Sequence, residues 1–437
     1  MTLRLQNESS LASLSAPSIH RLSNGLTIIA EQMPVDAVNL SIWLGVGSAL
    51  ESDDINGMAH FLEHMIFKGT QRIPSGAFEQ QVERKGAVMN AATSQDYTHY
   101  HITTAPSDFA ELAPLQVEVV MNAAIPDDAF ERERSVVLEE IRRANDNPRR
   151  RSYYRSMQVG FESLPYRRPV LGKEDIIQRL TPQQMRDFHS TWYQPQSMIA
   201  VAVGNLPVEM LVQTVAESFD AARPHEAIAP TSPLDPSFSR IAHLDLESPF
   251  TTIQGQEYTD SSLQQARMTM MWRVPGMADV HQTYPLDIVA YILGHGRTAR
   301  LFKDLREQRE LVTRISASNV TYARQGLFSI SAQLPAENVE VVEAAIAQHL
   351  TDLQTTPVQE SEINRVRTLV ANHYVFGNET PGSRAGLYGY YRAVVGDIAP
   401  ALNYPARIRA LDTVDVQTAA QRYLSPTAYG IVVSKPA

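Results

Sequence analysis

Apolar and polar positions follow the same succession in the two halves of this 437-residue chain. Alternating runs at Leu40–Val46 and Met268–Val274 predict strands, and the mostly apolar segments His60–Phe67 and Tyr284–Leu293 predict buried helices. Each half then continues with an amphipathic helix, polar-apolar strands, two longer helices, and a closing helix and strand. We therefore predict two homologous domains.

A proline-rich segment separates the halves. Residues 221–236 contain four prolines and almost no periodicity, which is typical of a linker. This predicts an N-terminal domain at 1–222, a linker at 223–243 and a C-terminal domain at 244–437. The order of elements predicts an α+β fold, in which each domain has a mainly antiparallel sheet with helices packed on one side.

The composition of the chain excludes several kinds of catalytic group and binding partner. The chain has no cysteine, so disulfides, thiolate catalysis and cysteine-bound metals are excluded. The net charge of -10 argues against a nucleic-acid partner, which would need a basic surface. No apolar run approaches the roughly 18 residues that span a membrane. The first residues contain no apolar block of signal-peptide length, so we expect a cytoplasmic protein.

Three polar residues interrupt an apolar segment between Asn56 and Gly69, two residues suited to begin and end a helix. His60, Glu63 and His64 share one face of that helix. Buried polar groups need partners, and a divalent metal between the histidines would provide one. The order His-x-x-Glu-His is also the inverted motif of zinc peptidases, with Glu63 beside the metal. The alternative is a buried helix whose histidines bond to backbone carbonyls.

A third metal ligand is expected in the segment that begins at Phe130. Helical spacing places Glu133 and Glu140 on one edge of its apolar face, whereas Glu139 points toward solvent. We therefore predict Glu140 as the ligand and Glu133 as a residue that orients a ligating histidine. The alternative makes both carboxylates ordinary solvated charges that face nearby arginines.

Two histidines and one glutamate favour zinc over magnesium or calcium. Such a zinc would lower the pKa of its water to about 7. Glu63 would then take the proton of this water as it attacks a peptide carbonyl, and would pass the proton to the leaving amine.

These residues resemble the pitrilysin, insulinase and mitochondrial processing peptidase family. His60-Phe-Leu-Glu-His looks like its inverted zinc motif, and Arg132, Glu133 and Glu140 match its downstream Arg-Glu-x6-Glu pattern. Other resembling segments extend over most of the chain. The segment Gly86–Tyr100 resembles the family's edge strand, which pairs with substrate backbone, so the resemblance implies that Asn90, Ala91 and Ala92 would line the substrate. An ordinary sheet edge with a polar outer face is the alternative.

The chain departs from the family pattern at one position. Active members supply an Arg and, seven residues later, a Tyr from a domain that faces the zinc. Arg306 matches the Arg as a substrate-binding residue, but Thr313 stands where the Tyr is expected. The resemblance therefore implies a clamshell with a related two-domain subunit that supplies Arg and Tyr, a heterodimer, although a homodimer is possible. A tyrosine from the group 388, 390 and 391 is another candidate replacement.

The leading prediction is a zinc endopeptidase that hydrolyses unfolded or short peptides within a closed chamber, as the catalytic subunit of a heterodimer. A non-catalytic core or assembly subunit of the same fold is the first alternative. A module that captures peptides without cutting them is the second. The complete set His60, Glu63, His64 and Glu140 favours the enzyme, because a purely structural subunit has no chemical need for it.

Overall fold

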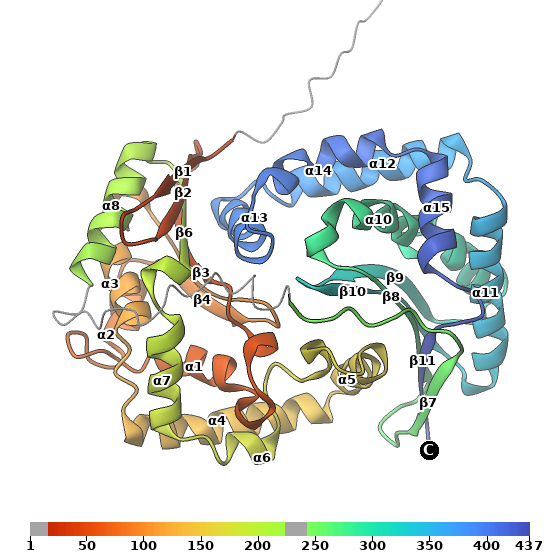
Figure 1. Cartoon of the computed structure of the whole chain (residues 1–437), viewed down its shortest axis with the longest axis horizontal. Helices are drawn as coiled ribbons and strands as arrows, with labels where there is room; N and C mark the ends of the chain where they lie inside the picture. The colour runs from red at the N-terminus through yellow and green to blue at the C-terminus, as the bar shows by residue number, and fades with distance from the viewer. Residues whose placement is uncertain (1–15, 223–242) are drawn as a thin grey trace, which may run out of the picture.

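The computed structural model describes residues 16–222 and 243–437. The predicted linker at 223–243 lies outside the described residues except for its last position. Helices and mixed sheets form two α+β halves, so the predicted fold class is confirmed (Figure 1). Among the described residues, no helix combines the length and the apolar character needed to cross a membrane.

The N-terminal half contains a six-stranded sheet in the order β1-β2-β6-β3-β5-β4, antiparallel except between β2 and β6. Its strands are β1 (Ser18–Arg21), β2 (Thr27–Gln32), β3 (Val38–Leu44), β4 (Val88–Thr93), β5 (Thr98–Thr104) and β6 (Met198–Gly204). Its helices are α1 (Met58–Ile66), α2 (Ala77–Arg84), α3 (Phe109–Met121), α4 (Asp127–Asp146), α5 (Pro148–Gly160), α6 (Glu174–Ile177), α7 (Pro182–Trp192) and α8 (Val208–Ala221).

The C-terminal half repeats the plan with a five-stranded sheet in the order β7-β11-β8-β10-β9. Its strands are β7 (Gln254–Thr259), β8 (Ala266–Pro275), β9 (Arg314–Thr321), β10 (Gln325–Leu334) and β11 (Gly430–Lys435). Its helices are α10 (Val280–Gly294), the π-helical η7 (Phe302–Gln308), α11 (Val339–Thr355), α12 (Glu360–Phe376), α13 (Pro381–Val394), α14 (Ala399–Ala410) and α15 (Thr413–Tyr423).

The helices of each half cover one face of its own sheet, and one helix of the other half packs on the second face. Helix α13 packs on β3 and β6, and α5 packs on β8 and β11. For this reason β3 is buried along its whole length although its sequence alternates. Gly389 of α13 lies so close to the Trp43 indole that an added Cβ would stand 2.1 Å from Nε1. The two halves are thus joined through reciprocal helix contacts.

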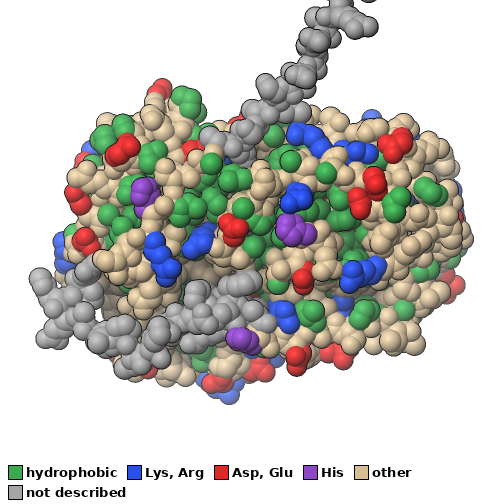
Figure 2. All heavy atoms as spheres, turned by 45° about the horizontal axis from the view of Figure 1, so that its top comes forward, with side chains coloured by type: hydrophobic (Ala, Val, Ile, Leu, Met, Phe, Trp, Pro, Cys, Tyr) green, Lys and Arg blue, Asp and Glu red, His purple; other side chains and the backbone are tan. Residues whose placement is uncertain are grey.

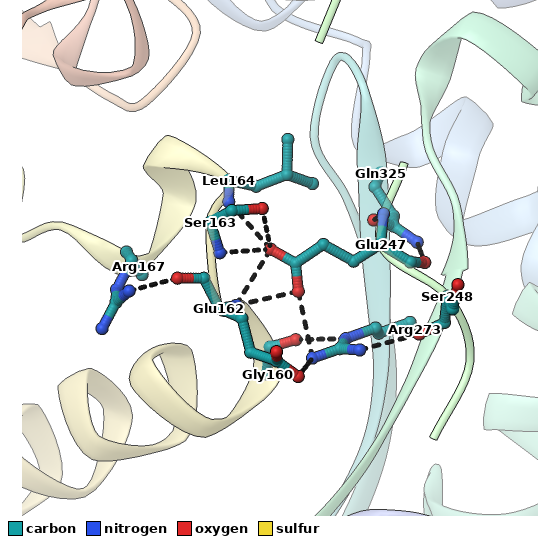
Figure 3. A network of polar contacts seen from close by, with 9 residues as sticks. All are labelled: Gly160, Glu162, Ser163, Leu164, Arg167, Glu247, Ser248, Arg273 and Gln325. Atoms are coloured by element: carbon teal, nitrogen blue, oxygen red, sulfur yellow. Dashed lines mark hydrogen bonds and ion pairs between the residues drawn. The ribbon is translucent and has the colours of Figure 1, made fainter. Parts of the chain in front are cut away.

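Polar contacts fix the C-terminal end of α5 to the second half (Figure 3). The Glu247 carboxylate accepts hydrogen bonds from the backbone N–H groups of Glu162, Ser163 and Leu164 at 2.8–2.9 Å and pairs with Arg273 at 3.0 Å. Arg273 is buried and also donates from Nε to the Gly160 carbonyl at 2.8 Å. Buried charges are retained where they are fully paired, as here. These contacts hold α5, whose other end reaches the site described below.

The start of α1 differs from the sequence-based prediction. The predicted cap, Asn56, does not accept from the helix; its Nδ2 donates to Glu51 Oε2 at 2.9 Å. Glu51 instead accepts from the N–H groups of Gly57 and Ala59, both at 2.8 Å. A carboxylate suits this position because the first N–H groups of a helix lack partners and carry positive partial charge. Gly57 is left-handed, with φ 99°, and precedes the first helical residue.

Candidate metal centre

Helices α1 and α4 bring three predicted ligands together. The Nε2 atoms of His60 and His64 lie 3.5 and 3.6 Å from the same oxygen, Oε2 of Glu140. His60 and His64 are one helical turn apart on α1, and Glu140 faces them because Phe130, Val137 and Ile141 bury the adjacent face of α4. Among the described residues, these three are the one group of His, Asp or Glu whose donor atoms all lie within 4.8 Å of one another.

The geometry of the three donors fits a tetrahedral zinc. Two donors bound to one such ion at about 2.0–2.1 Å lie roughly 3.4 Å apart, close to the two measured distances. Burial and the positive charge of His64 lower the pKa of His60, whereas the Glu140 carboxylate raises it. The net result is a pKa of about 4. His60 is therefore neutral at pH 7, the state in which imidazole binds metals.

Glu133 lies behind His64. Its Oε1 is 2.9 Å from His64 Nδ1, and its Oε2 pairs with Lys68 Nζ at 2.7 Å. Burial raises the pKa of Glu133, but Lys68 and His64 outweigh burial, so its pKa is lowered and it is a carboxylate. By accepting from Nδ1, this carboxylate leaves Nε2 of His64 as the nitrogen that faces Glu140. Glu139 lies apart from the group and pairs with Arg143 at 3.1 Å on the exposed side of α4.

Glu63 lines the same cavity as His60 and Glu140. Its Oε2 accepts a hydrogen bond of 2.6 Å from Thr93 Oγ1 on β4. Burial raises its pKa, and the hydrogen bond from Thr93 opposes that effect without cancelling it. A carboxylate with a raised pKa is a better proton acceptor than an exposed one.

The cavity has a volume of about 710 Å³, and its wall includes the edge of the N-terminal sheet. Ala91 and Ala92 of β4 line it together with His60, Glu63 and Glu140. β4 pairs only with β5 among the described strands, so its other edge is unpaired. Asn90 does not line the cavity; its Oδ1 accepts from the Ala91 N–H at 2.9 Å.

Sequence reasoning missed the contribution of α5. The first turns of this helix supply Arg149, Arg150, Tyr153 and Tyr154 to the cavity wall. The helix starts directly after α4 because Asn147 ends α4 and caps α5, accepting from the Arg149 N–H at 2.9 Å. The Asn-Pro pair followed by three arginines could have indicated a new helix start beside Glu140.

The residues predicted to act from the C-terminal half do not line this cavity, whose lining residues, among those that the structure describes, lie between His60 and Leu171. Arg306 is exposed on η7, with its guanidinium 4.7 Å from the centre of the Phe302 ring. Thr313 Oγ1 donates to Gln265 Oε1 at 2.8 Å. The candidate replacement tyrosines lie elsewhere on α13: Tyr388 donates to Glu31 at 2.8 Å, Tyr390 to the Thr321 carbonyl at 3.3 Å, and Tyr391 is buried.

Comparison with known proteins agrees with this architecture. Residues 26–173 match the family described as Insulinase (Peptidase family M16), and residues 179–370 match the one described as Peptidase M16 inactive domain. An uncharacterised zinc protease of Mycobacterium tuberculosis is 28% identical, over 97% of this chain and 94% of the relative. Zinc protease PqqE of Helicobacter pylori is 25% identical, over 95% and 92%. The crystal structure of a protease from Helicobacter pylori has the same fold, with a TM-score of 0.86, 23% identity and coverage of 96% and 99%.

Proposed function

Since this chain belongs to the insulinase-type peptidase family M16, we propose that it is a zinc-dependent endopeptidase that hydrolyses unfolded or short peptides. The observation that carries the proposal is the convergence of His60, His64 and Glu140 on one point, beside the Glu63 carboxylate. A non-catalytic subunit of the same fold has no chemical need for that convergence.

The three converging side chains would hold the metal, and Glu133 would orient His64. Zinc bound there supplies a Lewis acid, which polarises a carbonyl and lowers the pKa of water. Without a cysteine in the chain, no thiolate competes for the ion.

Glu63 would act as the general base. Its carboxylate is on the wall of the same cavity as His60 and Glu140, and the Thr93 hydroxyl fixes one of its oxygens at 2.6 Å. The carboxylate would accept a proton from the attacking water. Once protonated, Glu63 can donate that proton to the leaving amine.

The unpaired edge of β4 supports binding of extended peptides. A substrate strand added to this edge would bring its backbone past Ala91 and Ala92, two small side chains on the cavity wall. Compact folded proteins cannot present an extended backbone in this way, so unfolded or short peptides are the substrate class proposed. Asn90 lies on the same strand but does not line the cavity.

We further propose that a second, related chain closes the chamber. In the described part of the chain, the residues that line the cavity all come from the N-terminal half, and Arg306 and Thr313 are not among them. A partner that supplies Arg and Tyr would complete the site in a heterodimer, whereas a homodimer would supply Arg306 with Thr313 in place of the Tyr. Light scattering combined with peptide cleavage tests this point: rapid turnover by a chain that is monomeric throughout contradicts it.

The decisive experiment for the peptidase is cleavage of a quenched, unstructured peptide by the zinc-loaded protein. We expect turnover that a chelator abolishes and added zinc restores. Glu63→Gln should bind one zinc per chain, as wild type does, but lose roughly 10²–10⁴-fold in kcat, the range typical of general bases. Metal analysis of the same preparations separates loss of the base from loss of zinc. A fully active Glu63→Gln variant removes Glu63 from the role of base.

A further inference from the structure

A second cavity lies on the inner face of the C-terminal sheet, between that face and α5. It has a volume of about 430 Å³. The register of β8, β10 and β9 places its lining in rows across the sheet. The three rows nearest one end are Arg267–Gln333–Arg314, Thr269–Ser331–Ser316 and Met271–Ser329–Ser318. The first two of these rows carry only arginine, amide and hydroxyl side chains, which are fitted to a polar ligand.

Three arginines line this cavity, and the carboxylate nearest to them, Asp260, is already paired with Arg151. Arg267 and Arg314 come from the sheet, and Arg149 comes from the first turn of α5. In the described part of the chain, none of the three guanidinium groups forms an ion pair, and Nε of Arg267 is buried without a hydrogen-bond partner. The nearby Asp260 carboxylate is held by Arg151 at 2.6 Å.

The three charges act on one another. Burial, followed by the charges of Arg149 and Arg314, lowers the pKa of Arg267, and the charge of Asp260 opposes this shift without cancelling it. Like charges brought together in a partly buried site raise the free energy of the folded protein. An anion bound between them would remove that cost and would satisfy the unpaired Nε–H.

The cavity adjoins the candidate metal centre. Arg149 and Tyr153 line both cavities, so a peptide held on the edge of β4 can extend past α5 onto the serine-lined face. The hydroxyls along this route already pair with one another, Thr269 with Ser331 at 3.1 Å and Ser318 with Ser329 at 2.9 Å. Hydroxyls of this kind both donate and accept, which suits a polar peptide backbone.

We propose that the cavity lined by Arg149, Arg267 and Arg314 binds a carboxylate of the peptide substrate, either its C-terminal carboxylate or an acidic side chain. A guanidinium donates two parallel hydrogen bonds to a carboxylate, which makes Arg suited to this recognition. The proposal rests on the proposed function only in making the ligand a peptide. Despite the negative net charge of -10, the chain would therefore prefer acidic peptides.

The test measures binding, so that it does not depend on cleavage. The zinc-loaded Glu63→Gln protein is titrated into fluorescent, unstructured peptides of one sequence that end in an acid or an amide, with and without one internal glutamate. Anisotropy should show that peptides with a carboxylate bind about tenfold more tightly than the neutral amide, the factor expected of one charge-assisted contact. The difference should shrink as salt is added.

Two substitutions locate the effect. Arg314 is exposed, and replacing Arg267 removes an unpaired charge. Both variants, Arg314→Gln and Arg267→Gln, should therefore fold, which circular dichroism checks. Each should lower the preference for carboxylate peptides to about twofold or less and leave binding of the neutral amide unchanged. The control is Arg297→Gln, because Arg297 is an exposed arginine that lines neither cavity.

Each outcome has a defined meaning. A preference for terminal acid alone identifies the chain terminus as the ligand, and a preference for internal glutamate alone identifies a side chain; both support the proposal. Equal binding of all four peptides, or a preference that survives in both arginine variants, overturns it. A wild-type protein that shows the preference but cleaves none of the peptides, alone or with a partner chain, would keep this site and refute the peptidase.

Discussion

In each half of the molecule, a buried helix packs against the edge strand of the sheet and against a long helix. These are α1, β4 and α4 in the N-terminal half and α10, β9 and α12 in the C-terminal half. A cavity opens at the corresponding place in both halves, of about 710 Å³ in the first and about 560 Å³ in the second. Both contain histidine and carboxylate groups.

The two cavities differ in where their polar groups point. In the C-terminal one, the Asp287 carboxylate accepts from Asn319 Nδ2 at 2.8 Å and from the Tyr404 hydroxyl at 2.9 Å, and the Tyr291 hydroxyl is 3.0 Å from His373 Nδ1. These groups satisfy one another. In the N-terminal cavity, three donors face a common point.

The pKa values of the two carboxyl groups, Asp287 and Glu140, also differ between the two cavities. Burial raises the pKa of Asp287 to about 6, against the opposing hydrogen bonds. The hydrogen bond with His64 lowers the pKa of Glu140 despite burial. One scaffold therefore holds a carboxyl group in two ways, and a metal is expected only where a carboxylate and two imidazole nitrogens face one common point.

The largest effect should follow from removing the converging carboxylate. Glu140→Ala should lose zinc and, with it, all measurable turnover, because two histidines alone do not complete a three-ligand site. Zinc content after dialysis and peptide cleavage measure the two losses. The matched control is Glu139→Ala, the neighbouring residue, which pairs with Arg143 in solvent and should be nearly neutral. Full zinc occupancy in Glu140→Ala would end its assignment as a ligand.

A smaller effect is expected from Glu133, which contacts the predicted ligand His64 rather than the metal. Glu133→Gln keeps the size of the side chain but removes the charge that holds His64 Nδ1 and Lys68. Zinc affinity should fall by roughly 10–100-fold, as for other residues that orient a ligand, while the variant at saturating zinc recovers most of its activity. Competition with a chromophoric chelator gives the affinity. An unchanged affinity would mean that His64 is oriented by α1 alone.

The sequence was sufficient for these helical sites because fixed spacing along one helix determines which side chains share a face. That spacing alone places His60 and His64 on one side of their helix. It also separates Glu140, on the edge of the apolar face, from Glu139. The α+β order followed from local patterns in the same way. Arg149 and Tyr153 depend instead on how α5 crosses to the other half, a tertiary contact that no local pattern contains. Capping of α1 by Glu51 was missed because Asn56 is the more usual cap.

The smallest effect on turnover is predicted in the C-terminal cavity. Asp287→Asn should leave zinc content and cleavage unchanged, but should alter how stability depends on pH. With a pKa raised from 3.8 to about 6, the folded protein binds more protons than the unfolded chain between those values. Wild-type stability therefore falls as pH rises from about 4 to 6 and stays lower above that range.

The variant lacks this titration and should be more stable than wild type at pH 7.5, by up to about 3 kcal/mol, with the difference vanishing near pH 4. Thermal unfolding midpoints of both proteins across that range give the comparison. Asp96, whose pKa burial also raises to about 6, is present in both proteins, so its contribution cancels in the difference. A constant difference across pH would show that Asp287 is a carboxylate throughout, and the contrast between the two cavities would then lie in geometry alone.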